Sequence, residues 1–448
     1  MKITIPENVE IIIKRLIKGG YSAYVVGGCV RDSIMGAAPH DWDICTSAMP
    51  EETLNTLGSH NVIDSGLKHG TVTVNFGGSL FEITTFRTDG VYLDNRRPES
   101  VTFVRSLKED LSRRDFTINA IAYNHTDGIC DYFGGMEDIR NKIIRCVGNP
   151  DKRFNEDALR ILRALRFASK LGFEIEKYTS EAVHKNAGLL RNISAERIAS
   201  ELIRILNGEY VEKILTDYSD VIAVVIPEII PMIGFEQRNP HHIYDVWGHT
   251  VKVIAHSPHG KILRLAALFH DIGKPECYTI DEKGTGHFHG HPKISAAMAE
   301  KIMYRLKLDK KTISDVIVLI EYHDKRPPAE PKNVRRLLSK IGTENFKRLM
   351  ELKKADAKGQ NPDLLNQKLD YIAELERICE EETADGKQFT IKSLQINGND
   401  LMRLGIKEGR QIGLILKYLL SLVIDGAVEN EYHALVKEAA EYHNKYLN

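Results

Sequence analysis

The sequence predicts an α+β multidomain protein, because strand-like and helical patterns occupy different parts of a long chain. From Tyr21 to about Arg145, short runs rich in β-branched and aromatic residues alternate with glycine-containing turns. After Pro150, apolar residues recur at helical spacing almost to the end of the chain. The 448 residues are enough for about three domains.

Composition indicates the cellular environment of the protein more clearly than its function. Lys and Arg total 61 against 62 Asp and Glu, so bulk charge predicts no polyanionic partner, and any nucleic-acid contact needs local basic stripes. The six cysteines are scattered without a CxxC pair, which is typical of a reduced, cytoplasmic protein. The first apolar run, VEIIIKRLI, is short and interrupted by charge, so it predicts an amphipathic helix closed by Gly19 and Gly20. No stretch is long enough to span a membrane, and no membrane partner is expected.

The stretch VVGGCVRDSIMGAAPHDWDICTS, residues 25–47, contains two carboxylates at alternate positions, Asp41 and Asp43. On a strand, side chains at i and i+2 point to the same face. Two carboxylates a few ångströms apart repel each other unless a cation lies between them, and Mg²⁺ prefers such oxygen ligands. We therefore expect Asp41 and Asp43 to be catalytic metal ligands.

A glycine pair, Gly27 and Gly28, precedes these carboxylates at the junction of a predicted strand and a predicted helix. Glycines there let backbone N–H groups approach an anion, and a helix N-terminus favours phosphate. A phosphate cradle beside metal-binding carboxylates indicates nucleotidyl transfer. An isolated D-x-D is more often a solvated loop. Here the glycine pair, Arg31 and Asp32 accompany it and favour the functional interpretation.

This stretch resembles the signature of the class II tRNA nucleotidyltransferase and bacterial poly(A) polymerase family, within the DNA polymerase beta superfamily. Three further segments match that family in order, and the group they resemble is the CCA-adding enzymes. EDLSRRDFTINAIAYN resembles the ribose-reading motif, with Arg114 and Asp115. RFNEDALRILRALRFASKLGF resembles the base-reading helix, with Glu156, Asp157 and Arg160. RNISAERIASEL resembles the element that braces the helical neck, with Glu196 and Arg197.

The resemblance implies a polymerase-beta-like nucleotidyltransferase head with a mixed sheet, followed by all-helical neck, body and tail regions. The expected reaction is Mg²⁺-dependent addition of C, C and A to the tRNA 3′ end from CTP and ATP, without a nucleic-acid template. The acceptor stem of the tRNA is the expected partner, and no obligate protein partner is inferred. Gly27, Gly28 and Arg31 would hold the triphosphate. An A-adding enzyme or a poly(A) polymerase is the alternative within the family.

The base-reading pair also has a chemical argument. Asp157 and Arg160 stand at i and i+3, so we expect them to be neighbours on one helix face. Cytosine and adenine each present an amine donor beside a ring-nitrogen acceptor, which suits a carboxylate and a guanidinium. Uracil and guanine reverse both partners, and each unpaired buried polar group costs about 1–3 kcal/mol. A surface ion pair is the plain alternative. Arg163 and Arg166 continue at the same spacing, and some of these arginines would contact RNA phosphates instead.

Two assignments in the head remain open at this stage. Polymerases of the superfamily often use a third carboxylate, and both Glu82 and Asp115 are candidates. The polar segment RTDGVYLDNRRPESVTF, from Arg87 to Phe103, predicts a mobile loop. In the family such a loop accompanies addition of the terminal A, so it argues against an enzyme that adds only CC.

Histidines recur at helix-sized intervals in DVWGHTVKVIAH, LAALFHDIGKP, GHFHGHPKISAAMA and LIEYHDKRPP. Imidazoles and carboxylates are good ligands for first-row divalent metals such as Ni, Mn or Co. The adjacent His-Asp doublets resemble the HD phosphohydrolase superfamily. That resemblance implies a divalent transition metal, a place for Lys274 beside a phosphate, and two sets of ligands: principally His249, His270, Asp271 and Asp324, with His291 and His323 for a second ion.

These segments predict four regions: a head at 1–145, a helical neck and RNA-binding region at 146–235, an HD-type domain at 236–350 and a helical tRNA-binding tail at 351–448. A rival interpretation from a different class is an HD phosphohydrolase or RNA-binding protein with a silent head. The intact Asp41 and Asp43 argue against that interpretation.

Overall fold

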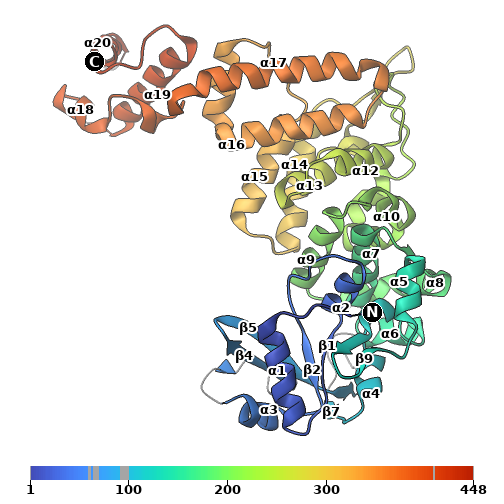
Figure 1. Ribbon diagram of the computed structural model, residues 1–448. Helices are drawn as coiled ribbons and strands as arrows, with labels where there is room; N and C mark the ends of the chain where they lie inside the picture. The colour runs from blue at the N-terminus through green and yellow to red at the C-terminus, as the bar shows by residue number, and fades with distance from the viewer. Residues whose placement is uncertain (1, 59–61, 64–69, 91–99, 407–408, 447–448) are drawn as a thin grey trace. The chain divides into compact units, whose positions relative to one another are not determined.

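The computed structural model of the chain describes residues 2–58, 62–63, 70–90, 100–406 and 409–446. Its contacts divide the chain into two compact units, Met1–Ile230 and Pro231–Asn448 (Figure 1). Unit 1 combines a mixed sheet with helices, and unit 2 is almost wholly helical. The predicted α+β multidomain class is confirmed.

The main sheet of unit 1 has seven strands in the order β3-β4-β5-β2-β1-β8-β9. Its pairs are antiparallel except for β2 and β5, which run parallel. The strands are β1 (Ala23–Val26), β2 (Ile44–Thr46), β3 (Val62–Ile63), β4 (Thr71–Phe76), β5 (Ser79–Thr85), β8 (Ile121–Asn124) and β9 (Gly128–Asp131). A separate hairpin pairs β6 (Arg87–Asp89) with β7 (Val101–Phe103). The predicted loop between Arg87 and Phe103 therefore begins and ends in strands, and its centre, 91–99, lies outside the described residues.

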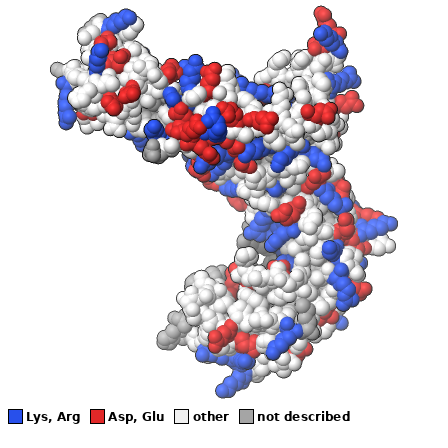
Figure 2. All heavy atoms as spheres, turned by 45° about the horizontal axis from the view of Figure 1, so that its top comes forward, with Lys and Arg blue, Asp and Glu red and all other residues white. Residues whose placement is uncertain are grey.

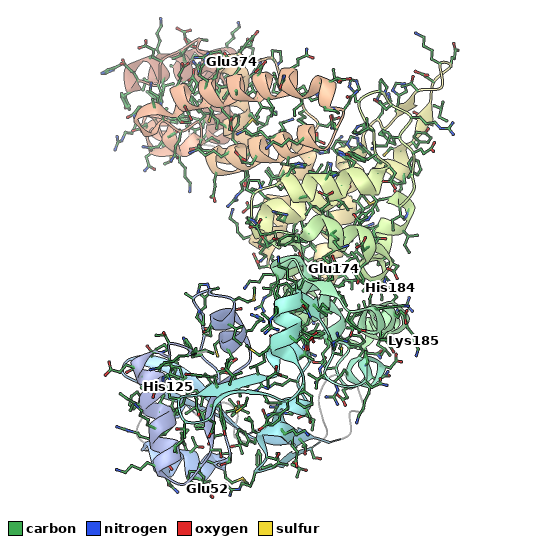
Figure 3. All side chains as sticks on the ribbon, turned by 45° about the vertical axis from the view of Figure 1, so that its right-hand side comes forward. Glu52, His125, Glu174, His184, Lys185 and Glu374 are labelled. Atoms are coloured by element: carbon green, nitrogen blue, oxygen red, sulfur yellow. The ribbon has the colours of Figure 1, made fainter. Side chains whose placement is uncertain are left out.

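Helices of the head pack on this sheet. The expected amphipathic first helix is α1 (Glu7–Lys18), which buries Val9, Ile12 and Leu16 and ends at Gly19. The other helices of the head are α2 (Gly28–Ile34), α3 (Pro50–Leu57), α4 (Leu107–Ser112) and α5 (Gly135–Asn141). Two ion pairs connect helices of the head to other segments. His125 pairs with Glu10 of α1 at 3.0 Å, and Glu52 of α3 pairs with Arg105 (Figure 3).

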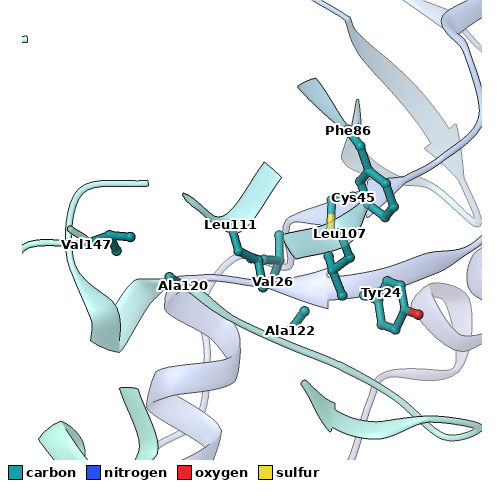
Figure 4. Close-up of a cluster of buried hydrophobic side chains, with 9 residues drawn as sticks. All are labelled: Tyr24, Val26, Cys45, Phe86, Leu107, Leu111, Ala120, Ala122 and Val147. Atoms are coloured by element: carbon teal, nitrogen blue, oxygen red, sulfur yellow. The ribbon is translucent and has the colours of Figure 1, made fainter. Parts of the chain in front are cut away.

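A core beneath the sheet holds the site-bearing segments in place. It joins strand residues Val26, Cys45 and Ala122 to Leu107 and Leu111 of α4 (Figure 4). Burial of a large apolar side chain stabilises a fold by about 1.5–3 kcal/mol. The end of β1, the start of β2 and α4 are therefore held in fixed relation.

The second half of unit 1 is helical, as predicted. Its helices are α6 (Pro150–Glu156), α7 (Leu159–Leu171), α8 (Lys177–Asn186), α9 (Ala195–Leu206), α10 (Val211–Asp217) and α11 (Ser219–Val225). A short parallel pair links β10 (Ile143–Ile144) to β11 (Glu174–Ile175). Ion pairs connect α8 to two other helices. His184 pairs with Asp220 of α11, and Lys185 pairs with Asp151 of α6 (Figure 3).

Unit 2 begins with four helices that carry most of the histidine segment: α12 (Val246–His256), α13 (Lys261–Phe269), α14 (His291–Arg305) and α15 (Lys310–Tyr322). The long α16 (Pro331–Lys358), kinked at Gly342, packs against α12 and α17 (Leu365–Thr383). The boundary placed between residues 350 and 351 therefore falls inside α16. A separate apolar cluster joins α18 (Gly398–Arg403), α19 (Gly409–Asp425) and α20 (Tyr432–Tyr446). Among the described residues, no helix has the length and apolar character needed to cross a membrane.

Candidate functional sites

Asp41 and Asp43 lie just ahead of β2 rather than within it, so their predicted place on a strand is wrong by a few residues. Both are exposed. The backbone N–H of Val26 donates to the carbonyl oxygen of Asp43 at 3.0 Å, which holds Asp43 beside the end of β1. Partial desolvation raises the pKa of the Asp43 carboxyl, and the charge of Asp41 raises it further, while Arg114 acts in the opposite direction. A bound divalent cation would relieve this repulsion.

The strand register favours Glu82 as the third carboxylate. In the parallel pairing of β2 with β5, Ile44 is opposite Ile83. Asp43 directly precedes Ile44 and Glu82 directly precedes Ile83, so both carboxylates stand one position ahead of the same pair. Side chains at matching positions of paired strands point to the same face. Glu82 is exposed, as a metal ligand at a surface site requires.

Asp115, the other candidate, is buried and has partners of its own. Its Oδ2 pairs with Arg163, and its Oδ1 accepts hydrogen bonds from the backbone of Phe116 and the side chain of Asn119. Burial opposes ionisation, but Arg163 and Asn119 outweigh it and lower the pKa of Asp115 to about 2. Both oxygens of Asp115 are therefore occupied by partners within the protein.

The glycine turn is shaped by backbone conformation and by Arg114. Gly27 has φ of 81°, and a Cβ atom there would lie 3.2 Å from Nη1 of Arg114. The backbone thus leaves room for that guanidinium, which pairs with Asp110 at 3.3 Å. Arg31 is buried behind the turn, where it donates to Asn119 Oδ1 at 2.6 Å and pairs with Asp32. Arg31, one of the predicted phosphate ligands, is thus held by Asn119 and Asp32 in this structure.

The predicted helix-face pair of Asp157 and Arg160 is not formed. Asp157 ends α6 in an extended conformation, and its Oδ1 accepts from the backbone N–H of Leu159, so the helix breaks there. Its Oδ2 pairs with Arg197 of α9 at 2.9 Å. Arg160 instead pairs with Glu156 at 2.7 Å and donates to the carbonyl of Arg113. Asp157 therefore lies at the junction of α6 and α7, and Arg197 of α9 orients its carboxylate.

Arg163 and Arg166 follow on α7 and surround an aromatic ring. Their guanidinium carbons lie 5.5 and 4.4 Å from the ring centroid of Phe167, and that of Arg31 lies 5.1 Å away. Arg166 also pairs with Glu201 of α9, and desolvation lowers the pKa of Arg166 to about 10. These arginines join the glycine turn to the neck.

Unit 2 contains two groups of metal-ligand type that share one carboxylate. His249, His270 and Asp271 form the first group, and Asp271, His291 and His323 the second, within the described residues. Asp271 Oδ2 lies 3.3 and 3.2 Å from Nε2 of His249 and His270, whereas Oδ1 lies 3.2 and 3.6 Å from Nε2 of His291 and His323.

The tautomers of these histidines follow from their backbone contacts. Each Nδ1 lies within hydrogen-bond distance of a carbonyl oxygen, namely Gly359 for His249, Ala267 for His270, Phe288 for His291 and Ile320 for His323. A carbonyl oxygen can only accept, so Nδ1 carries the hydrogen and Nε2 of the neutral ring presents a lone pair. The Nε2 atoms face each other in pairs at 3.2 Å.

This arrangement fits divalent transition metals. Asp271 Oδ1 is buried and accepts no hydrogen bond, so it retains lone pairs for another partner. Burial alone would lower the pKa of His249, but Asp271 and Asp356 raise it to about 9. The carboxylates of Asp271 and Asp356 therefore attract positive charge to these histidines, either protons or metal ions.

Asp356 of α16 is a member of this cluster that the sequence reasoning missed. Its Oδ1 lies 3.1 Å from Nε2 of His249 and 3.9 Å from that of His270. The expected ligand Asp324 is exposed and, like Asp356, belongs to neither three-residue group, and both carboxylates line the cavity beside the cluster. Lys274 pairs with Asp271 Oδ2 at 2.7 Å, which places its ammonium at the edge of the cluster.

Three family models match the chain. One described as "Poly A polymerase head domain" matches residues 23–145, and "Probable RNA and SrmB- binding site of polymerase A" matches residues 172–231. A third, "tRNA nucleotidyltransferase domain 2 putative", matches residues 288–439.

Known relatives cover the chain from end to end. A CCA-adding enzyme of Leuconostoc mesenteroides is 33% identical over 455 residues, which span 99% of each chain. One of Geobacillus kaustophilus is 52% identical over 209 residues, which are 47% of this chain and 51% of that enzyme. The crystal structure of the Bacillus stearothermophilus CCA-adding enzyme in complex with CTP is 30% identical, with a TM-score of 0.70 over 98% of both chains. The chain therefore belongs to the CCA-adding enzymes, a family of tRNA nucleotidyltransferases.

Proposed function

We propose that this protein adds C, C and A to the 3′ end of tRNA, using CTP and ATP without a nucleic-acid template. In this reaction the tRNA 3′ hydroxyl attacks the α-phosphate of the nucleotide and pyrophosphate leaves. The observation that carries the proposal is the placement of Asp41 and Asp43 beside the Gly27 turn. Solved relatives include a CCA-adding enzyme with ATP and one complexed with tRNA, each 21% identical, and these support a shared fold.

Asp41, Asp43 and Glu82 would hold Mg²⁺, because all three are exposed carboxylates and the charge of Asp41 opposes ionisation of Asp43 in its absence. When bound there, Mg²⁺ supplies charge neutralisation and lowers the pKa of an attacking hydroxyl. The chain's own groups do the positioning. Backbone N–H groups after Gly27 are available to the triphosphate, and Arg114 adds a positive charge close to the turn.

Nucleotide choice is assigned to Asp157, with Arg160 as its partner. Arg197 fixes the Asp157 carboxylate at 2.9 Å, so the acceptor group is held in one orientation before the base arrives. A fixed carboxylate accepts from the amine of cytosine or adenine and repels the carbonyl of uracil or guanine. Arg160 would exchange one of its present acceptors for the ring nitrogen of the base.

One incubation tests the main proposal. Labelled CTP and ATP are supplied to tRNAs that end before CCA, after C and after CC, and the products are sequenced. Growth of all three to CCA is expected. Extension only of the tRNA that ends in CC would identify an A-adding enzyme, and a long A tail would identify a poly(A) polymerase. No incorporation into any substrate would leave a silent head and overturn the proposal.

The cluster in unit 2 favours a second activity, the hydrolysis of phosphate esters. The specific observation is that four Nε2 lone pairs converge on the shared carboxylate of Asp271. Bound Ni, Mn or Co ions would polarise a water molecule at this position. Lys274, at the edge of the cluster, would neutralise a phosphate oxygen. The expected substrate is a phosphomonoester or a 2′,3′-cyclic phosphodiester.

Hydrolysis of 2′-phosphates and 2′,3′-cyclic phosphates, with nickel, manganese or cobalt added in turn, tests this second proposal. His270→Ala should abolish hydrolysis while CCA addition stays near its normal rate, because the two sites lie in different compact units. An absence of hydrolysis with every metal, together with metal-free purified protein, would reduce the cluster to a structural role.

A further inference from the structure

Three cavities adjoin one another beside the metal-ligand cluster of unit 2. The inner cavity, of about 250 Å³, reaches Asp271, Lys274 and His291. A middle cavity of about 300 Å³ shares His323 and Asp356 with it. The outer cavity has about 370 Å³ and shares Lys353 with the middle one. Arg326 lines all three, and these three neighbouring cavities are together called the channel.

The middle cavity has the lining of a base-binding site. Leu364, Ile372 and the ring of Tyr371 supply apolar surface, and Gln367 supplies a side-chain amide. The amide of Gln360 is already engaged, because it donates to Asp356 Oδ1 at 2.8 Å and accepts from Lys368. Tyr371 donates a hydrogen bond to the carbonyl of Pro327 at 2.7 Å, so its ring is held in place. Aromatic rings stack on nucleobases of any sequence, and amides can both donate to and accept from base edges.

The outer cavity is basic. Its charged lining consists of cations alone: Lys325, Arg326, Arg336, Lys340 and Lys353. Two of them are already committed, because Lys353 donates to the carbonyls of His323 and Lys325 and Arg336 pairs with Asp425.

The other three cations, Lys325, Arg326 and Lys340, form no ion pair within the ranges that the structure describes. Like charges gathered in a cavity destabilise the protein, and a bound phosphate would relieve that repulsion.

Surface charge favours entry of a phosphate-bearing chain through the outer, basic cavity over entry across α17. Figure 2 shows acidic side chains gathered over that part of the molecule, and α17 has six acidic residues against two basic ones, Lys368 and Arg377. Phosphates are repelled by such a face and attracted by a cationic cavity.

We propose that the cluster acts on the 3′ end of an RNA strand in preference to a mononucleotide. The terminal phosphate ester occupies the inner cavity, the terminal base the middle cavity, and the next phosphate upstream the basic outer cavity. In the reaction, water adds to phosphorus, the bond from phosphorus to one ribose oxygen breaks, and that oxygen takes a proton. This inference rests on the proposed hydrolytic function and names its substrate.

The test compares a pentaribonucleotide ending in a 2′,3′-cyclic phosphate with the cyclic mononucleotide of the same base, using the metal-loaded full chain. We expect kcat/KM to be at least about tenfold higher for the pentamer, since one phosphate contact and its released counterions favour it. In the double variant Lys325→Gln/Lys340→Gln, the pentamer's advantage should disappear. Lys301→Gln, which removes an exposed lysine of α14 from outside the channel, is the matched charge control and should leave both values unchanged.

Binding gives a readout independent of turnover. A fluorescent 3′-phosphorylated pentamer is titrated with metal-free protein at several salt concentrations. The double variant should bind more weakly. Its log Kd should also depend less steeply on log salt concentration, with a slope smaller by about one, because about one counterion fewer is released. Equal kcat/KM for pentamer and mononucleotide, with unchanged binding in the double variant, would overturn this inference while hydrolysis itself remained. Failure of the wild-type protein to hydrolyse either substrate would instead overturn the hydrolytic function.

Discussion

Asp115 and Arg163 form an ion pair whose carboxylate is buried, in which Oδ2 of Asp115 lies 2.7 Å from Nε and 2.5 Å from Nη2 of Arg163. The pair links the segment after α4 to helix α7. Its strength is visible in the pKa of Asp115, which Arg163 and Asn119 hold at about 2 in spite of burial. A carboxylate bound in this way stabilises unit 1.

The ion pair predicts a pH-dependent loss of stability. The folded pKa of Asp115 lies below its ordinary value of 3.8, so the stabilisation is fully present above about pH 4 and is lost as the pH falls towards 2. Asp115→Asn should therefore unfold more easily at pH 7, by about 2 kcal/mol, and the difference from the wild type should shrink below pH 4. Urea unfolding followed by Trp42 fluorescence in a Trp247→Phe background reports on unit 1.

Glu174→Gln is the control for this experiment, because the ion pair of Glu174 with Lys213 is exposed. Such pairs contribute little to stability, so this variant should match the wild type at both pH values. A stability difference for Asp115→Asn that stays constant from pH 7 to pH 3 would contradict the assignment.

The carboxylates of the head predict a graded loss of activity. Asp41→Asn or Asp43→Asn should reduce incorporation of both CTP and ATP by several orders of magnitude, because every addition step uses the same metal platform. Glu82→Gln should also impair both nucleotides without changing the unfolding midpoint, whereas Asp115→Asn should lower that midpoint. Single-turnover incorporation and urea unfolding of the same preparations measure the two effects. Normal activity of Glu82→Gln would remove it from the site.

Asp157 and Arg197 predict a loss of selectivity. Asp157→Ala should admit UTP or GTP relative to CTP and ATP, since the carboxylate that repels their carbonyl groups is gone. Arg197→Met should have a weaker effect of the same kind, because Asp157 keeps its charge but loses its partner at 2.9 Å. The measurement is kcat/KM for each of the four nucleotides on a tRNA that ends before CCA. Unchanged ratios in Asp157→Ala would place base selection elsewhere.

The cluster of unit 2 predicts which aspartate binds metal. Asp356→Asn should lower the nickel or manganese content of the protein after dialysis, because Asp356 lies beside His249. Asp324→Asn, at an exposed position outside both groups, should leave that content unchanged. Elemental analysis of the two variants, prepared in parallel, decides between them. The reverse result would restore Asp324 as a ligand.

Local pattern was enough to predict the general architecture and the first helix, α1. It predicted less well where a side chain competes with the backbone. Asp157 sits in a sequence of helical periodicity, yet its carboxylate caps Leu159 and ends α6. Aspartate favours such caps over helix interiors. The sequence contained this signal, but the regular spacing of the arginines after Asp157 outweighed it.

Long-range contacts account for the remaining differences. Asp356 lies in the run KKADAK, where nothing distinguishes it from a solvated helical aspartate. It reaches His249 because α16 packs against α12, and no local pattern encodes that packing. The choice between Glu82 and Asp115 also depends on long-range contacts. These are the pairing of β2 with β5 and the ion pair of Asp115 with Arg163 of α7.

The shared carboxylate of Asp271 has a consequence for how the cluster would fill. One oxygen faces His249 and His270, and the other faces His291 and His323. A first ion would draw electron density from the whole carboxylate and leave the second oxygen a poorer donor. Ions would also repel each other across so short a bridge. Occupancy should therefore rise in two well-separated steps, so that over a broad range of metal concentration the protein exists mainly as a half-loaded form.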